Sequence, residues 1–307
     1  QFTGMAKKLP SKANQLFYAL FLSIFLMAGC DKFEGDQTVP SYIRIDSIGV
    51  KITSSTQGTA SASLTDAWVY VDDQLIGCFE LPAIVPVLAE GNCTVKVYPG
   101  FKINGMNNTR APHPMFNFLT FKKNLIPDSI IPLTNQLING KQTLLTTYRE
   151  NCTFKWMESF ADPSISLDSV KSSETNIGLT PDGFGDVFEG QFSGRIYMPD
   201  SVTYFLGTNN EDLNLPKNGK AVILELNYKT NVDVTIGMYA TSTSETVMQP
   251  LLVLSPTSIW KKIYINLSPF VSSQTSAISY KVFFGVLRSE SDSTGEVLLD
   301  NIKLVHL

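Results

Sequence analysis

From residue 151 onward, apolar and polar residues alternate with a period of two, which is the spacing of a β-strand with one buried face. The clearest runs are 222–228, 232–239 and 263–267. Because only a short turn at Thr230-Asn231 separates the first two runs, we expect them to form an antiparallel hairpin. Residues 282–287 are apolar at successive positions and predict a central strand.

The first half of the chain also predicts strands. Residues 41–150 are rich in β-branched residues and have no sustained helical period. The apolar runs 68–71 and 75–79 flank the polar turn Asp72-Asp73-Gln74, which indicates a hairpin. Four prolines between residues 111 and 135 keep that stretch extended, because proline removes a backbone donor. The chain is therefore expected to be all-β, with two sandwich domains.

The N-terminus has the pattern of a secretory signal. Three lysines precede the apolar run 16–27, which is too short to span a bilayer. The run ends in Leu26-Met27-Ala28-Gly29-Cys30, which resembles the lipobox of bacterial lipoproteins. The resemblance implies that residues 1–29 are a signal peptide with the residues upstream of it, that Cys30 is lipidated, and that residues 30–40 are a tether. A buried helix with a chance cysteine is the alternative.

The tether carries Asp31, Glu34 and Asp36 directly after Cys30. This acidic segment resembles the export signal of Bacteroidetes-type surface lipoproteins, and implies an outer-membrane protein that faces the cell exterior. Under the enterobacterial sorting rule, Asp31 would instead keep the protein in the inner membrane. Several acyl chains on one cysteine bury enough methylenes to hold a protein on its membrane.

The charge of the chain argues against a nucleic-acid partner. The sequence has 24 basic and 28 acidic residues, a formal charge of −4. Removing residues 1–29 takes away three lysines and no acidic residue, so the formal charge changes from −4 to −7. An acidic protein of this kind does not attract phosphate backbones.

The cysteines and histidines are too few to indicate a metal site or a catalytic triad. Besides Cys30 there are Cys78, Cys93 and Cys152; Cys78 and Cys93 are the best candidates for a disulfide, and buried free thiols are the alternative. With His113 and His306 as the only histidines, zinc, haem and a catalytic triad are not expected, and His113 is expected to pack on its neighbours. We therefore predict a protein without enzymatic activity, although a pair of carboxylates for glycoside hydrolysis stays open.

Two resemblances extend the pattern to fold families. The order of hairpin, glycine turn and "VKVYPG" strand across residues 64–104 resembles small immunoglobulin-like (Ig-like) repeats, which implies an Ig-like β-sandwich over residues 41–150. Three later segments resemble motifs of jelly-roll carbohydrate-binding modules: Met157–Phe160, Trp260–Leu267 and the closing strand Gly295–Leu304 with its "LDNI". They imply a jelly roll over residues 151–307.

The second resemblance also implies a structural calcium ion. In that family an acidic residue near the opening strand and the aspartate of the closing motif hold the ion, which would here be Glu158 and Asp300. The alternative is that Asp300 caps a turn and Glu158 is solvated.

Sugar binding needs aromatic faces and polar groups that pair with hydroxyls. Outward residues of the alternating strands supply this mixture, and we place them on one sheet as a ligand-binding hypothesis: Glu225, Asn227, Asp233, Tyr239, Tyr264 and Asn266. An ordinary solvated sheet face has the same composition. Trp260, at a strand start, is expected in the core.

The sequence therefore favours a lipid-anchored surface protein that binds glycan through its C-terminal jelly roll, alone or beside an outer-membrane transporter. The alternative is a structural subunit of an outer-membrane assembly, secretion or transport complex, with an outer-membrane β-barrel protein as partner. Apart from calcium, no cofactor is expected.

Overall fold

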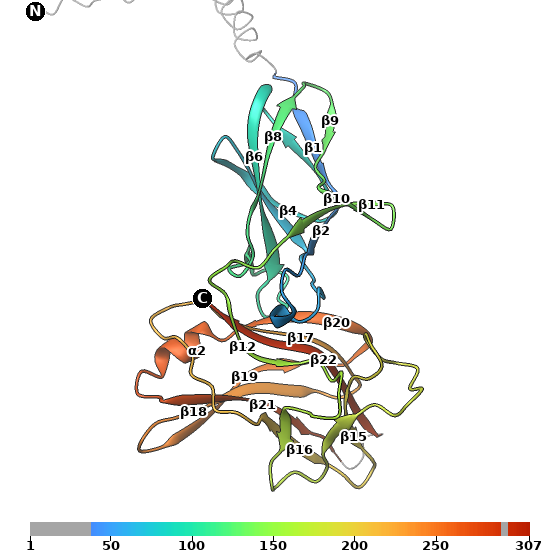
Figure 1. Ribbon diagram of the computed structural model, residues 1–307, viewed down its shortest axis with the longest axis vertical. Coiled ribbons are helices and arrows are strands. Elements are labelled where there is room, and N and C mark those ends of the chain that lie inside the picture. Colours follow the sequence, from blue (N-terminus) through green and yellow to red (C-terminus); the bar gives the residue numbers. More distant parts are fainter. Residues whose placement is uncertain (1–37, 290–293) are drawn as a thin grey trace, which may run out of the picture. The chain divides into compact units, whose positions relative to one another are not determined.

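The structure is a computed structural model, and it describes residues 38–289 and 294–307 (Figure 1). The predicted signal peptide, Cys30 and most of the tether lie outside the described residues. Within the described part, no helix is both long and apolar enough to cross a membrane. Helical structure is limited here to a 3-10 turn at Ser55–Gln57 and the short helix α2, Ser268–Ser273, and the fold is all-β, as predicted.

The strands up to residue 146 form three small sheets around one apolar cluster. The sheets have the orders β5-β1-β9, β10-β11-β2 and β4-β3-β6-β7, with β8 also paired to β6. The strands are β1 (Ser41–Ile45), β2 (Ser47–Val50), β3 (Asp66–Val71), β4 (Gln74–Glu80), β5 (Ala83–Val87), β6 (Gly91–Lys102), β7 (Arg110–Pro112), β8 (Leu119–Leu125), β9 (Ile130–Pro132), β10 (Gln136–Ile138) and β11 (Lys141–Thr146).

The predicted hairpin at Asp72-Asp73 is confirmed. Strands β3 and β4 pair antiparallel, and both aspartates have positive φ, 47° and 66°, as a tight primed turn requires.

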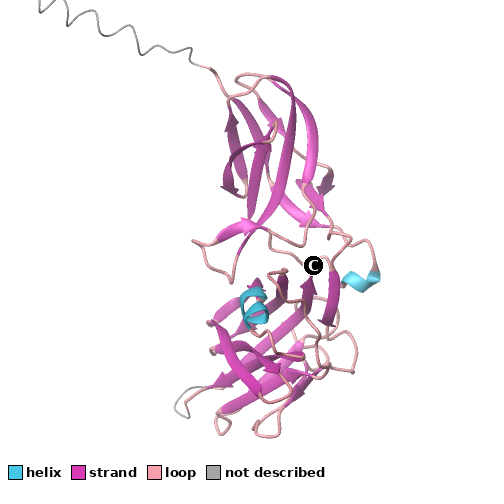
Figure 2. Ribbon diagram, turned by 90° about the vertical axis from the view of Figure 1, so that its left-hand side faces the viewer, coloured by secondary structure: helices cyan, strands magenta, loops and turns pink. Residues whose placement is uncertain are grey.

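The strands from residue 153 form a jelly-roll β-sandwich of two facing sheets (Figure 2). The six-stranded sheet has the order β14-β15-β22-β17-β20, with β12 also paired to β22, and the five-stranded sheet has the order β13-β16-β21-β18-β19. The strands are β12 (Thr153–Glu158), β13 (Leu167–Ser169), β14 (Ile177–Leu179), β15 (Gly194–Met198), β16 (Tyr204–Asn209), β17 (Val222–Thr230), β18 (Val234–Thr241), β19 (Thr246–Leu254), β20 (Thr257–Asn266), β21 (Ser279–Leu287) and β22 (Gly295–His306).

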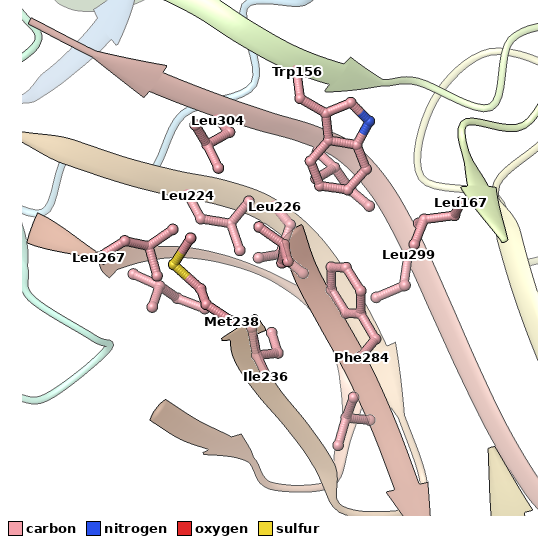
Figure 3. Packing of buried hydrophobic residues seen from close by; sticks show 14 of the residues in the cluster. Trp156, Leu167, Leu224, Leu226, Ile236, Met238, Leu267, Phe284, Leu299 and Leu304 are labelled. Carbon is pink, nitrogen blue, oxygen red and sulfur yellow. The ribbon is translucent and has the colours of Figure 1, made fainter. Parts of the chain in front are cut away.

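The core of this sandwich lies between its two sheets (Figure 3). Leu224 and Leu226 of β17 point toward Ile236 and Met238 of β18, and all four are fully buried. The alternation seen in the sequence is therefore the alternation between this core and the outer face of each sheet.

The predicted hairpin of residues 222–239 is wrong. Strand β17 pairs with β20 and β22, whereas β18 pairs with β19 and β21. The turn at Thr230-Asn231 carries the chain from one sheet to the facing one, so both apolar faces enter the same core. The prediction that residues 282–287 are central is confirmed, because β21 lies between β16 and β18.

Residues Ser41–Leu307 form one compact unit. Among the described residues, no sheet combines strands from before and after residue 150, and a single bridge, between Ile103 and Tyr264, joins the two sets. Independent domains at 41–150 and 151–307 stay a prediction, as does the Ig-like classification of the first.

The predicted Cys78–Cys93 disulfide is wrong, because both thiols are free, as is Cys152. Cys78 lies on β4 and Cys93 on β6, and β3 runs between these two strands. Along the chain β5 comes between β4 and β6, and in their sheet β3 separates them, so the two cysteines do not meet.

Gly194 offers a test of core packing. A Cβ atom there would lie 2.4 Å from the ring of the buried Phe160, whereas a Cβ at Gly178, on the adjacent strand, would have no neighbour within 4 Å. We expect Gly194→Ala to lower the free energy of unfolding by about 1–3 kcal/mol in urea titrations, because overpacking forces core side chains to move. Gly178→Ala is the matched control, and equal midpoints for the two variants would contradict this account.

Candidate functional site

The outer face of the six-stranded sheet carries two cross-strand rows of polar residues. Strand register places Lys303, Glu225 and Tyr264 side by side on β22, β17 and β20. The next row, on the same three strands, is Asp300, Asn227 and Lys262. We call these six residues the polar rows.

The polar rows are buried although they face away from the jelly-roll core. Glu225 and Asp300 are 0% exposed, and the Lys262 side chain is 3% exposed. The Tyr148 hydroxyl donates to Glu225 Oε1 at 2.9 Å, and Lys262 Nζ lies 3.5 Å from Glu225 Oε2. The strand group of residues 41–150 therefore covers this face at Glu225, whereas the hydrogen-bond partners of Asp300 are Ser193 and Asn301 of the jelly roll itself.

The cover includes an extended segment, Thr59–Ser63. Every second residue of this segment makes a hydrogen bond to a different strand of the sheet. Thr59 Oγ1 donates to Asn301 Oδ1 at 2.9 Å, and Ser61 Oγ donates to Asn227 Oδ1 at 2.7 Å. The Ser63 backbone N–H then donates to the Tyr264 hydroxyl at 2.9 Å. The sequence "TASAS" shows this period of two, and that was the signal from which the contact could have been found.

A second part of the cover is the β6–β7 turn, which lies against the edge strand β20. The Asn104 backbone N–H donates to Tyr264 O at 3.0 Å, and Asn104 Oδ1 accepts from the Asn266 backbone N–H at 2.8 Å. Asn104 and Gly105 both have positive φ, 54° and 72°, a backbone that asparagine and glycine adopt most readily. The turn thus gives hydrogen-bond partners to an edge strand that would otherwise stay open.

Burial shifts the pKa values of the charged groups on this face. Desolvation lowers the pKa of Lys303 to about 8 and also lowers the pKa of Lys262, with Glu225 acting in the opposite direction on both. Desolvation raises the pKa of Asp300 to about 6, against hydrogen bonds from Ser193 and Asn301.

These contacts correct the ligand-binding hypothesis in two ways. Glu225, Asn227 and Tyr264 are together on one face, as predicted, but they are buried by protein. Tyr239 lies on β18 of the opposite sheet and Asp233 precedes that strand, so the predicted single surface does not exist. Asn266 is on β20 with Tyr264 and contacts Asn104.

Trp260 is not in the core, contrary to expectation, because it lies half-buried at the edge of the six-stranded sheet. Its Nε1 donates to Asp186 Oδ1 at 2.9 Å, and its ring meets that of Phe188 edge-on. His113 packs between the rings of Phe101 and Phe116, as expected, and burial lowers its pKa to about 3.

The two predicted calcium ligands do not converge by register. Glu158 pairs with the core residue Ile302, whereas Asp300 pairs with Asn227 on the opposite face of the same sheet. Each carboxylate already accepts hydrogen bonds: Glu158 from Phe160 and Ser166, and Asp300 from Ser193 and Asn301. In the part of the chain that is described, no three acidic, cysteine or histidine residues cluster as metal ligands. Calcium binding stays a prediction.

The outer face of the five-stranded sheet carries a different set of side chains. Phe283 lies across Gly237, where a Cβ would come within 2.3 Å of its ring, and packs against Tyr239 with ring centroids 5.3 Å apart. Tyr204 pairs with Leu287 and Tyr239 with Lys281 at positions of β21 that alternate with its core residues, so the two tyrosines share this face. Burial and then Tyr204 raise the pKa of Tyr239. Lys281 pairs with Tyr239 across the strands. We call Tyr204, Tyr239, Lys281 and Phe283 the aromatic face.

No family model matches the chain, and no curated protein matches it. Among solved structures, it is similar to the CBM22-2 xylan-binding domain from Paenibacillus barcinonensis, with 14% identity, 50% of this chain and 99% of that chain covered, and a TM-score of 0.37. A structure of carbohydrate-binding modules from the β-sandwich superfamily is 11% identical, with 88% and 99% covered and a TM-score of 0.38. The enzymatically active domain of tailspike protein 4 from Bacteriophage CBA120 is 11% identical, with 48% and 20% covered and a TM-score of 0.37.

Removing one charge from the polar rows should destabilise the folded protein. Lys262→Met leaves the Glu225 carboxylate buried without its nearest cation, so we expect the free energy of unfolding to fall by about 3–5 kcal/mol. Lys261→Met, at the exposed neighbour on β20, is the matched control and should change it by less than about 0.5 kcal/mol. If urea titrations gave the two variants equal stabilities, the buried pair would have no structural role.

The raised pKa of Asp300 predicts a pH dependence. Between its ordinary value of 3.8 and about 6 the folded protein holds a proton that the unfolded chain releases, so this contribution to stability is lost as pH rises through that window. Asp300→Asn should remove it: the stability of the parent relative to the variant should fall between about pH 4 and about pH 7. Asp168→Asn, an exposed aspartate, is the control, and a pH-independent difference for Asp300→Asn would contradict the shift.

Proposed function

We propose that this chain is a lipid-anchored protein of the outer-membrane surface that binds glycans through its jelly roll and catalyses no reaction. The observation that carries the proposal is the aromatic face. It belongs to the sheet that the first strand group does not cover: among the described residues, the hydrogen bonds from residues 41–150 to the jelly roll go to the six-stranded sheet. An uncovered sheet face with tyrosines and a lysine suits pyranose rings and their hydroxyls.

The aromatic face is also pre-organised. Phe283 is buried beneath Tyr239, which fixes the position of the tyrosine ring, and Lys281 Nζ donates to Asn210 O at 3.0 Å. Rings and donors that are already held in place lose less entropy when a sugar binds. The lipid anchor is supported by the sequence pattern at Cys30, and His113 is enclosed by aromatic rings and out of reach of a substrate.

A structural role in an outer-membrane complex is the second candidate. It is favoured by apolar side chains exposed on short strands of the first group: Ile84 on β5, Ile130 on β9 and Leu137 on β10 are 54%, 56% and 65% exposed. Exposed apolar residues that join into one patch are typical of surfaces that meet another protein. Co-purification with a membrane protein, together with no retention on any glycan, would favour this role.

Calcium binding is a separate proposal that rests on the sequence motif alone, since Glu158 and Asp300 lie on opposite faces of the sheet. If the ion binds, calcium should raise the melting temperature by linkage, and a chelator should reverse the shift. Asp300→Asn should abolish the response, whereas Asp168→Asn should keep it. An unchanged melting temperature at millimolar calcium would remove the ion from the account.

The aromatic face should set glycan affinity. In affinity electrophoresis on a panel of soluble polysaccharides, we expect Tyr239→Ala to weaken retention by roughly three- to tenfold, the worth of one aromatic stacking contact. Tyr197→Ala, an exposed tyrosine on the other sheet, is the matched control. Retention that is absent for the parent protein on every polysaccharide, or insensitive to Tyr239→Ala, would contradict the proposal.

A further inference from the structure

One face of the small sheet β5-β1-β9 is apolar and points to solvent. Along β1 and β5 every second residue is buried in the core of the first strand group, as Ile43 and Val85 are. The residues between them point the other way, and β9 adds two more at the same register. Leu88, which is 71% exposed, continues the alternation of β5. We call the apolar residues of this side the N-terminal face: Tyr42, Ile84, Pro86, Leu88, Ile130 and Pro132.

Prolines close both edges of this sheet, which in the described part of the chain are β5 and β9. The Tyr42 backbone N–H donates to Ser129 O at 2.9 Å, so Tyr42 directs its backbone groups to β9. Pro86, opposite Tyr42 on β5, therefore has its nitrogen at the open edge. On β9 the Leu133 N–H donates to β1 at 2.9 Å, which leaves the nitrogen of Pro132 at the other open edge.

A proline nitrogen carries no hydrogen, so a strand from a second copy or from another protein finds donors missing at either edge. What covers the N-terminal face therefore lies on the face and not along an edge. An exposed patch of joined apolar side chains marks contact with another surface.

The proposed lipid anchor brings a bilayer within reach of this face. Cys30 is 11 residues before Ser41, the first residue of β1. Even a fully extended chain of this length spans at most about 40 Å. Tethering at such a distance keeps the effective concentration of the bilayer high, so a contact too weak to hold the free protein is still formed.

The composition of the N-terminal face suits the boundary between headgroups and acyl chains. Ile84, Leu88 and Ile130 supply exposed aliphatic surface, and Tyr42 combines an aromatic ring with a polar hydroxyl, as residues at membrane interfaces do. Arg44, the charged residue on the same side of β1, is paired with Asp46 at 2.9 Å. The contact would therefore depend on burial of apolar surface more than on anionic lipids.

We propose that the N-terminal face lies in the headgroup region of the bilayer that holds the anchor, with Ile84, Leu88 and Ile130 against the acyl chains. This inference rests on the lipid anchor of the proposed function. Strand β1 is then both the first strand after the tether and the centre of the membrane contact, which fixes the side of the first strand group that meets the bilayer.

The test uses the full acylated chain in vesicles of phosphatidylethanolamine and phosphatidylglycerol, with and without brominated acyl chains, which quench tryptophan. Ile130→Trp places a reporter on the N-terminal face, and we expect its emission to be quenched beyond that of the parent protein. High salt should leave this quenching unchanged. Val253→Trp, at an apolar residue of β19 that is 51% exposed, is the matched control and should add no quenching.

A second variant tests the apolar character of the contact. Ile84→Asp, added to Ile130→Trp, should abolish the extra quenching, because a carboxylate on this face resists transfer out of water. Because Ile84 is exposed, this change should leave the fold and the retention on glycans unaltered. Quenching that persists in the double variant would overturn the inference.

Flotation of the vesicles separates this inference from the proposed function. Protein that floats with the vesicles but shows no extra quenching for Ile130→Trp keeps the anchor and overturns the membrane contact of the face. Protein that does not float overturns the anchor, and this inference with it. Quenching that a co-purified membrane protein abolishes would make the occupant a protein, and would also overturn the inference.

Discussion

The burial of the polar rows against the first strand group is the interaction on which the rest of the structure depends. A sheet face that carries Glu225, Lys262 and Lys303 would ordinarily be solvated. Here Tyr148, Thr59 and Ser61 supply partners from elsewhere in the chain, so the charges leave water without losing all of their hydrogen bonds. Residues 41–307 form one compact unit around this contact.

Buried charges of this kind determine position more than they add stability. The desolvation cost of an ion pair offsets most of its Coulomb energy, but a charge left without its partner is expensive. Each row therefore penalises a shift of one strand group along the other. Apolar residues on the same face, Ile223 and Val305, join the core of the first strand group and contribute the hydrophobic part of the contact.

Because the first strand group contacts only one of its sheets among the described residues, the two outer faces of the jelly roll differ in their surroundings. The six-stranded sheet holds the first strand group, and the five-stranded sheet keeps its aromatic face open for a ligand. At the edge strand β20 the cover ends, and Trp260 and Lys261 are among the residues that line a cavity there. One strand thus takes part in the jelly-roll core, in the covered contact and in a pocket.

The sequence by itself determined the strands and which residues face inward, because side chains alternate with a period of two whatever a strand pairs with. It predicted the inward positions of Leu224 and Ile236 and the turn at Asp72-Asp73. It also indicated that Glu225, Asn227 and Tyr264 share a face. Only the tertiary structure decided that β17 and β18 lie in facing sheets, and that a third strand separates Cys78 from Cys93. It also decided that the first strand group covers Glu225, Asn227 and Lys303 of the polar rows. Alternation specifies the side of a strand and not its neighbour, and a neighbour 77 residues away, as Tyr148 is from Glu225, is chosen by packing that no local pattern encodes.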